Sequence, residues 1–152
     1  MIVFLVILHS LVSIALIGAI THQGFSAWRR RAPAVAFIDR FRAVPASGYA
    51  AAVVVLYALD FALGAYIYPL FVLDVKASLA ESGFNKEIFY FQAKEHIAVI
   101  GLVMLPAYYH YWRRAPLGEF VMTRRFITTV LMLCVWWNLI VGHILNNLRG
   151  ML

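Results

Sequence analysis

The sequence predicts an all-α integral membrane protein: a four-helix bundle, up-down-up-down, with N- and C-termini extra-cytoplasmic. Three observations lead to this prediction: an apolar composition, four apolar stretches of spanning length, and basic residues gathered on alternate connections. The 152-residue chain is 64% hydrophobic and only 13% charged, and its mean hydropathy is +0.82. A small soluble core cannot bury that much apolar surface. We therefore expect residues 1–152 to form a single transmembrane bundle.

The four spans follow from hydropathy and length. A membrane-crossing helix needs roughly 20 mostly apolar residues. Stretches of about that length lie at about residues 2–21, 48–72, 96–112 and 126–146. The first has no basic segment before it and no clear cleavage motif after it, so we interpret it as a retained helix rather than a secretory signal. Short links between four helices are typical of an up-down-up-down bundle.

Two connections differ in character. Residues 32–45 mix aromatic and basic side chains between two prolines, which predicts a short segment lying in the membrane interface. Residues 73–95 contain acidic residues and lysines in near balance, and we expect them to form an outer loop. Cys134 is the single cysteine and lies in the fourth span, so the sequence offers no disulfide framework.

The positive charge indicates the orientation in the membrane. Nine of the 13 basic residues lie on the first and third connections: Arg29, Arg30, Arg31, Arg40, Arg42, Arg113, Arg114, Arg124 and Arg125. Cytoplasmic connections carry an excess of Lys and Arg, which places both termini and the 73–95 loop outside. The net charge of +6 therefore reflects topology and not nucleic-acid binding. The expected location is the inner (cytoplasmic) membrane, crossed several times, with the lipid bilayer as first partner.

The five histidines fall near the ends of the predicted spans. In this topology His9, His96 and His143 lie at the outer level, and His22 and His110 at the inner level. Ionisable residues at membrane depth are costly and point to function. Imidazole is also a common axial ligand of haem iron. The histidines are therefore the first candidates for a cofactor site.

Their spacing suggests two layers. His9 and His22 are 13 residues apart and His96 and His110 are 14 apart, about 20 Å along each helix at 1.5 Å per residue. In this the chain resembles the membrane dihaem b-type cytochromes, in which two helices each carry two such histidines. The resemblance rests on these two pairs alone. It implies two b haems stacked across the bilayer, carrying electrons between a quinone pool and a partner redox protein.

Helical phase leaves one pairing open. At about 100° per residue, His96 and His110 share a face, whereas His22 lies about 140° from His9. The outer haem therefore has two candidate pairs, His96 with His9 or His96 with His143. The inner pair, His22 with His110, has no competitor.

Two carboxylates are candidate catalytic groups. Asp60 lies near the middle of the second span, where it needs a partner, a proton or water. Two roles are open for Asp60. One is a proton relay at a quinone site, and the other is a structural bond to a tyrosine, to Asn138 or to a histidine. Glu95 precedes His96 and is a candidate for the same quinone site, for orienting an imidazole, or for favouring the helix dipole.

Two other functions remain open. The outer histidines His9, His96 and His143 with Glu95 suit copper or zinc, although this metal-handling function leaves the inner pair unused. A cofactor-free accessory subunit of a larger membrane complex also fits the size. Any enzyme role we expect is that of the electron-transfer subunit of a quinone-linked oxidoreductase, acting in a larger redox complex or with an extra-cytoplasmic redox partner.

Overall fold

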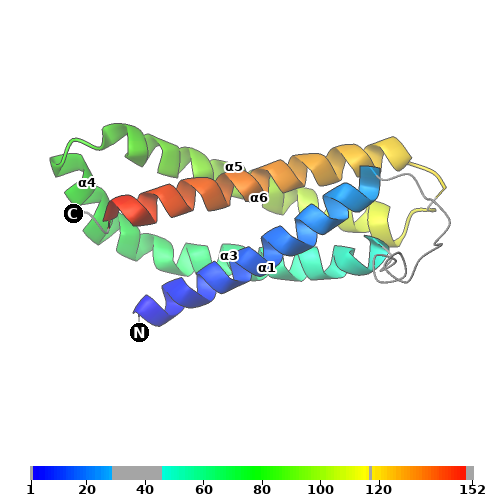
Figure 1. The fold of residues 1–152 in the computed structure, drawn as a ribbon, viewed down its shortest axis with the longest axis horizontal. Helices are drawn as coiled ribbons and strands as arrows, with labels where there is room; N and C mark the ends of the chain where they lie inside the picture. Colours follow the sequence, from blue (N-terminus) through cyan, green and yellow to red (C-terminus); the bar gives the residue numbers. More distant parts are fainter. Residues whose placement is uncertain (1, 29–45, 117, 150–152) are drawn as a thin grey trace, which may run out of the picture.

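The computed structural model describes residues 2–28, 46–116 and 118–149 of the chain. Within them the chain forms five α-helices and one π-helical turn (Figure 1). In order these are α1 (Ile2–Trp28), α3 (Ala46–Leu70), the π-helical turn η1 (Phe71–Val75), α4 (Lys76–Glu81), α5 (Asn85–Arg113) and α6 (Val121–Arg149). The predicted interfacial segment 32–45 lies outside the described residues.

The four long helices confirm the predicted all-α class and the four candidate spans. Each is long and apolar enough to cross a membrane, with stretches of 26, 27, 29 and 28 residues in chain order. Their outer surfaces are apolar as well: Val103 is 72% exposed and Leu133 is 60% exposed. Water disfavours extended apolar surfaces of this kind, whereas lipid accommodates them. The architecture is that of a multi-pass membrane protein.

Helix α5 is longer than hydropathy predicts. It begins at Asn85, well before the expected start at residue 96, and α4 also lies within the segment 73–95 that we expected to be a loop. Lys86, Glu87 and Lys94 lower the hydropathy of this stretch. Lysine, glutamate and glutamine are nevertheless good helix formers. Hydropathy therefore locates the membrane-crossing part of α5 and not the whole helix.

Neighbouring helices run antiparallel. Along the contact between α1 and α6, Trp28 Nε1 donates to Thr129 Oγ1 at 2.9 Å and Trp136 Nε1 donates to Thr21 Oγ1 at 3.0 Å. Residue numbers thus fall on α1 as they rise on α6. Each of the four long helices packs mainly against two others, in the cyclic order α1, α3, α5, α6. The start of α1 and the end of α6 consequently lie at the same end of the bundle (Figure 1).

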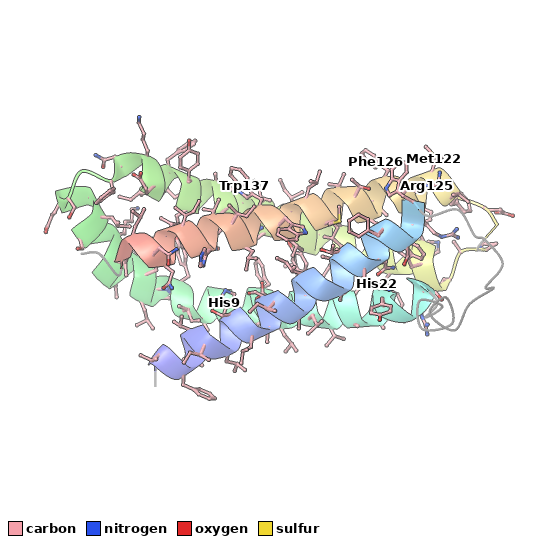
Figure 2. All side chains as sticks on the ribbon, viewed as in Figure 1. His9, His22, Met122, Arg125, Phe126 and Trp137 are labelled. Carbon is pink, nitrogen blue, oxygen red and sulfur yellow. The ribbon has the colours of Figure 1, made fainter. Side chains whose placement is uncertain are left out.

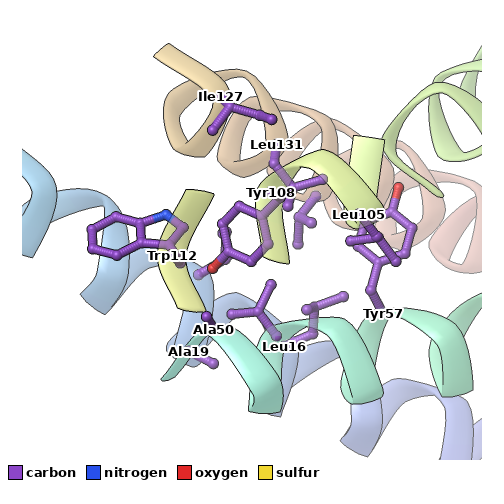
Figure 3. Close-up of a cluster of buried hydrophobic side chains, with 12 residues drawn as sticks. Leu16, Ala19, Ala50, Tyr57, Leu105, Tyr108, Trp112, Ile127 and Leu131 are labelled. Atoms are coloured by element: carbon purple, nitrogen blue, oxygen red, sulfur yellow. The ribbon is translucent and has the colours of Figure 1, made fainter. Parts of the chain in front are cut away.

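The main hydrophobic core fills the half of the bundle in which α1 ends and α6 begins, which we call the core half. Tyr108 of α5 is fully buried in it (Figure 3). Its hydroxyl donates to Gln23 Oε1 on α1. Trp112 Nε1 donates to the buried Thr128 Oγ1 at 2.9 Å. The other buried members of this core are Leu16, Ala19, Ile20, Ala50, Val53, Tyr57, Leu105, Ile127, Leu131 and Val135. All four long helices contribute to it.

Arg124 closes the core half at the turn between α5 and α6. Its side chain is almost fully buried, and its guanidinium donates to the carbonyl oxygens of Tyr111 at 2.6 Å, Pro116 at 2.5 Å and Glu119 at 2.7 Å. The last carbonyls of a helix have no partner within the helix. The buried arginine satisfies them and fixes the turn.

The opposite end of the bundle is closed by a second apolar cluster, which we call the cap. Its buried members are Val75, Leu79, Ile88, Val141 and Leu145. Helix α4 ends in a Schellman motif, with Gly83 at φ 83° and the amide of Phe84 donating to the carbonyl of Leu79 at 2.9 Å. This turn leads the chain back into α5, so that η1, α4 and α5 pack over the end of α6.

Candidate functional site

A cavity of about 390 Å³ lies in the other half of the bundle, which we call the cavity half. Side chains from α1, α3, α5 and α6 line it, together with Phe71 and Val75 of η1. Mostly apolar cavities with a few polar groups are the usual form of small-molecule sites. The polar lining residues are His9, Ser10, Ser13, Tyr57, Asp60, Tyr68, Lys94, Glu95, Asn138, His143 and Asn146.

Asp60 meets His9 across the contact between α3 and α1. His9 Nδ1 lies 3.1 Å from Asp60 Oδ1, an ion-pair contact without the alignment of a hydrogen bond. The imidazole packs beside Gly64, where a Cβ would stand 3.5 Å from His9 Cε1. The mid-span carboxylate thus has a partner, and of the candidates expected from the sequence it is a histidine.

Ser13 extends this contact into a network. Its Oγ lies 2.6 Å from Asp60 Oδ1 and 2.9 Å from the backbone oxygen of His9. A hydroxyl has one proton to donate. With Asp60 ionised, Ser13 donates to the carboxylate; with Asp60 protonated, Asp60 donates to Ser13 and Ser13 donates to the His9 carbonyl. The contact between Ser13 and Asp60 therefore exists with Asp60 either ionised or protonated, which is a property of a proton relay.

Lys94 and Glu95 form a second polar group on the α5 wall. Lys94 Nζ donates to Glu95 Oε1 at 2.6 Å and lies 4.8 Å from the centroid of the Phe91 ring. The Lys94 side chain is only 15% exposed. Because a lysine and a glutamate neutralise each other here, the pair adds no net charge to the cavity.

His143 lines the α6 wall. Its Nε2 lies 3.2 Å from Asn147 Nδ2 on the same helix. The neighbouring Gly142 lines the cavity too, and a Cβ built there would meet no atom within 4 Å. His9 and His143, from the adjacent helices α1 and α6, thus line the same cavity.

The rim of the cavity indicates where it opens. Ser10 and Ile14 of α1, and His143 and Asn146 of α6, line the cavity and are also exposed. Among the described residues, the side-chain hydrogen bonds between α1 and α6 lie in the core half, and Figure 1 shows α1 diverging from α6 toward its start. One exposed part of the cavity wall therefore lies between these two helices, on the side surface of the bundle.

His96 lies outside the cavity wall. Its side chain is exposed, and its Nδ1 lies 2.7 Å from the carbonyl oxygen of Gln92, one turn earlier in α5. The structure thus brings His9, His143 and Glu95 to one cavity and leaves His96 apart. Neither of the two outer pairs expected from the sequence, both of which include His96, is brought together.

His22 and His110 are also held apart. The His22 ring stacks on Tyr49 with centroids 4.5 Å apart, and the exposed His110 ring packs edge-on against Tyr111. At this level α1 and α5 are joined by Tyr108 and Gln23. Within the described residues, His22 Nδ1 and Gln23 Nε2 have no hydrogen-bond partner.

The two halves differ in how well their residues suit a haem. Two imidazoles on neighbouring helices, beside open volume and a glycine without neighbours, are a suitable set of groups for haem iron and a flat macrocycle. The cavity half offers them in His9, His143 and Gly142. In the core half, packed side chains lie between α1 and α5, and the present arrangement does not fit a haem.

The copper or zinc alternative gains no support from the geometry. Within the described ranges, no three histidine, cysteine, aspartate or glutamate side chains are grouped so as to hold an ion. The four ligands expected for copper or zinc, His9, His96, His143 and Glu95, include His96, which lies outside the cavity.

Sequence reasoning missed Ser13 and Gly64. Ser13 follows His9 by one helical turn, and residues four apart share a helix face, so the spacing was a usable signal. Gly64 follows Asp60 by the same interval on α3 and packs against the His9 ring. Asn138, expected as a partner of Asp60, instead donates to the backbone oxygen of Cys134 at 2.7 Å.

Comparison of the chain with protein-family models, with curated proteins and with solved structures gives no match. The cavity and its residues are therefore the basis for a functional proposal.

Proposed function

We propose that this chain is a membrane b-type cytochrome, the electron-transfer subunit of a quinone-linked oxidoreductase, and that it holds haem b in the cavity. The observation that supports this most directly is the presence of two histidines, His9 and His143, on neighbouring helices around one membrane-embedded cavity. The haem would supply one-electron chemistry at its iron. Quinone and a partner redox protein are its proposed electron-exchange partners.

The protein's own residues have definite roles in this proposal. His9 and His143 bind the iron, and Asp60 orients His9 through its contact with Nδ1. Asp60 and Ser13 also take up a proton, because their contact exists in both protonation states. In this proposal the ammonium of Lys94, which donates to Glu95 at the cavity wall, would pair with a haem propionate.

The proposal includes an orientation. Arg113, Arg114, Arg124 and Arg125 lie at the core-half end, which by the positive-inside rule faces the cytoplasm. The antiparallel helices then run up-down-up-down, with both termini and the cap outside the inner membrane. The cavity half is consequently the half nearer to an extra-cytoplasmic redox partner.

A second haem between His22 and His110 stays a prediction of the sequence. For these residues to share a haem, Tyr108 and Gln23 would have to separate. The number of haems per chain therefore distinguishes a cavity-only cytochrome from a dihaem one.

The test is a reduced-minus-oxidised absorbance spectrum with haem quantification, on protein purified from cells supplied with haem. We expect the α band of a six-coordinate b-type haem in the wild type, and its loss or conversion to a five-coordinate form in His9→Ala and in His143→Ala. His96→Ala is the matched control, since His96 lies outside the cavity, and should keep the wild-type spectrum.

A colourless wild type would overturn the proposal. A six-coordinate spectrum and a haem content in His143→Ala that both equal those of the control would exclude His143 as a ligand. In His22→Ala, the loss of one haem of two would establish the inner site.

A further inference from the structure

A separate feature lies on the lipid-facing surface of the core half, where the end of α1 packs against the start of α6. Met122, Arg125 and Phe126 lie together there (Figure 2). Large apolar side chains at the end of α1 and the start of α6 are exposed: Phe25 is 71% exposed, Trp28 52% and Phe126 70%. We call these five residues, Phe25, Trp28, Met122, Arg125 and Phe126, the α1–α6 seam patch.

The edge of the Arg125 guanidinium that faces α1 is held in place by two contacts. Its Nε donates to the carbonyl oxygen of Ala27 at 3.0 Å, and its guanidinium carbon lies 5.1 Å from the centroid of the Trp28 ring. Trp28 is itself held by its bond to Thr129. The guanidinium is therefore pre-oriented, and little conformational entropy is lost when it binds a further group.

Among the described residues, the outer edge of the same guanidinium has only a weak acceptor. Nη1 lies 3.8 Å from the sulfur of Met122, a weak acceptor, and Nη2 has no hydrogen-bond partner in the described part of the chain. A guanidinium presents a planar fork of N–H groups that matches a phosphate. A stacked arginine with a free edge above exposed aromatic rings is thus suited to an anion that carries apolar chains.

We propose that the α1–α6 seam patch binds one anionic phospholipid, with its phosphate on Arg125 and its acyl chains along Phe25 and Phe126. Charge supports this occupant: at this end the described charged residues are Arg113, Arg114, Glu119, Arg124 and Arg125. Tryptophan and arginine are also the residues expected at headgroup level. This site does not depend on the proposed haem.

The matched control is Arg113, at the end of α5. It is exposed and belongs to the same end of the bundle, so removing it changes the net charge by the same amount. Unlike Arg125, it does not contact Trp28 or Ala27. A comparison of the two variants separates a defined lipid site from general attraction to an anionic surface.

The experiment is native mass spectrometry of the full chain released from micelles that contain phosphatidylglycerol or phosphatidylcholine. We expect a one-to-one phosphatidylglycerol adduct on the wild type, about fivefold weaker in Arg125→Gln, as one basic contact near a membrane predicts. Arg113→Gln should stay within about twofold of the wild type, as is usual for an exposed charge.

Equal loss in the Arg125 and Arg113 variants, or equal binding of the two lipids, would refute the site. Glycerol phosphate in place of the lipid should give no adduct; an equal adduct would show an anion site without lipid selectivity and would also refute it. If Arg125→Gln does not fold by circular dichroism, Phe126→Ser provides the test. It keeps the guanidinium and should still weaken the adduct, and unchanged binding would contradict the proposal.

Discussion

The two halves of this bundle are built from the same four helices and use their polar side chains in opposite ways. In the core half, polar groups meet in isolated cross-helix pairs, such as Tyr108 with Gln23 and Trp112 with Thr128, within close packing. In the cavity half, His9, Asp60 and other polar groups gather around open volume. Open volume forfeits dispersion contacts. The comparison indicates that the core half provides stability, which allows the cavity half to keep open volume.

The largest expected effect contrasts a leucine in each half. Leu131 is fully buried in the core half, and Leu139 lines the cavity. Leu131→Ala should lower the free energy of unfolding by about 2–5 kcal/mol, because it opens a void in packed surroundings. Leu139→Ala enlarges a void that already exists and should cost about 1 kcal/mol or less.

Denaturant titration of both leucine variants in detergent micelles, followed by circular dichroism, provides the measurement. Similar losses in the two variants would mean that the halves do not differ in packing.

A smaller effect is expected for the buried pair of Tyr108 and Gln23. Either Tyr108→Phe or Gln23→Leu removes one partner and leaves the other without a hydrogen bond, at a cost of about 1–3 kcal/mol each. The double variant leaves neither group unpaired and should be more stable than the sum of the single losses predicts. Additive losses in the same titration would show that the two side chains do not interact.

The smallest effect concerns Ser10 and Ser13, two serines about one turn apart on α1 that bond to different partners. Ser13 bonds Asp60 on another helix, whereas Ser10 bonds only the Val6 backbone of its own helix. Ser13→Ala should cost about 1 kcal/mol, typical of one hydrogen bond, and Ser10→Ala should be close to neutral. Thermal unfolding of both variants, compared with the wild type, checks the difference, and a reversed order would count against the Asp60 network.

Hydropathy predicted the spans well, because spanning length and apolar composition are properties of each segment by itself. It could not predict which face of α5 is turned inward. A membrane helix is apolar on all sides, so it lacks the polar stripe that marks the outer face of a helix in water. His96 and His110 were expected to share a face of α5, and both are exposed. The sequence did not reveal that this face is the outer one.

The partner of Asp60 also required the structure. Depth in the membrane predicted that the carboxylate needs a partner, and it finds His9 and Ser13. Which histidine it meets depends on how far α1 slides along α3, and apolar contacts of similar size allow many such positions. Gly64 lies beside the imidazole, and its lack of a side chain favours the observed position of α1 along α3.

The exposed part of the cavity wall between α1 and α6 determines the route by which a molecule would enter the cavity. The cap packs over the end of the bundle, so an incoming molecule reaches His9 and Asp60 from among the lipid tails. The bilayer is the solvent of such a molecule, and each binding event would displace lipid hydrocarbon from the cavity. Occupancy would then follow the mole fraction of the molecule in the membrane, and adding lipid at a constant total amount of that molecule would lower the mole fraction and empty the cavity.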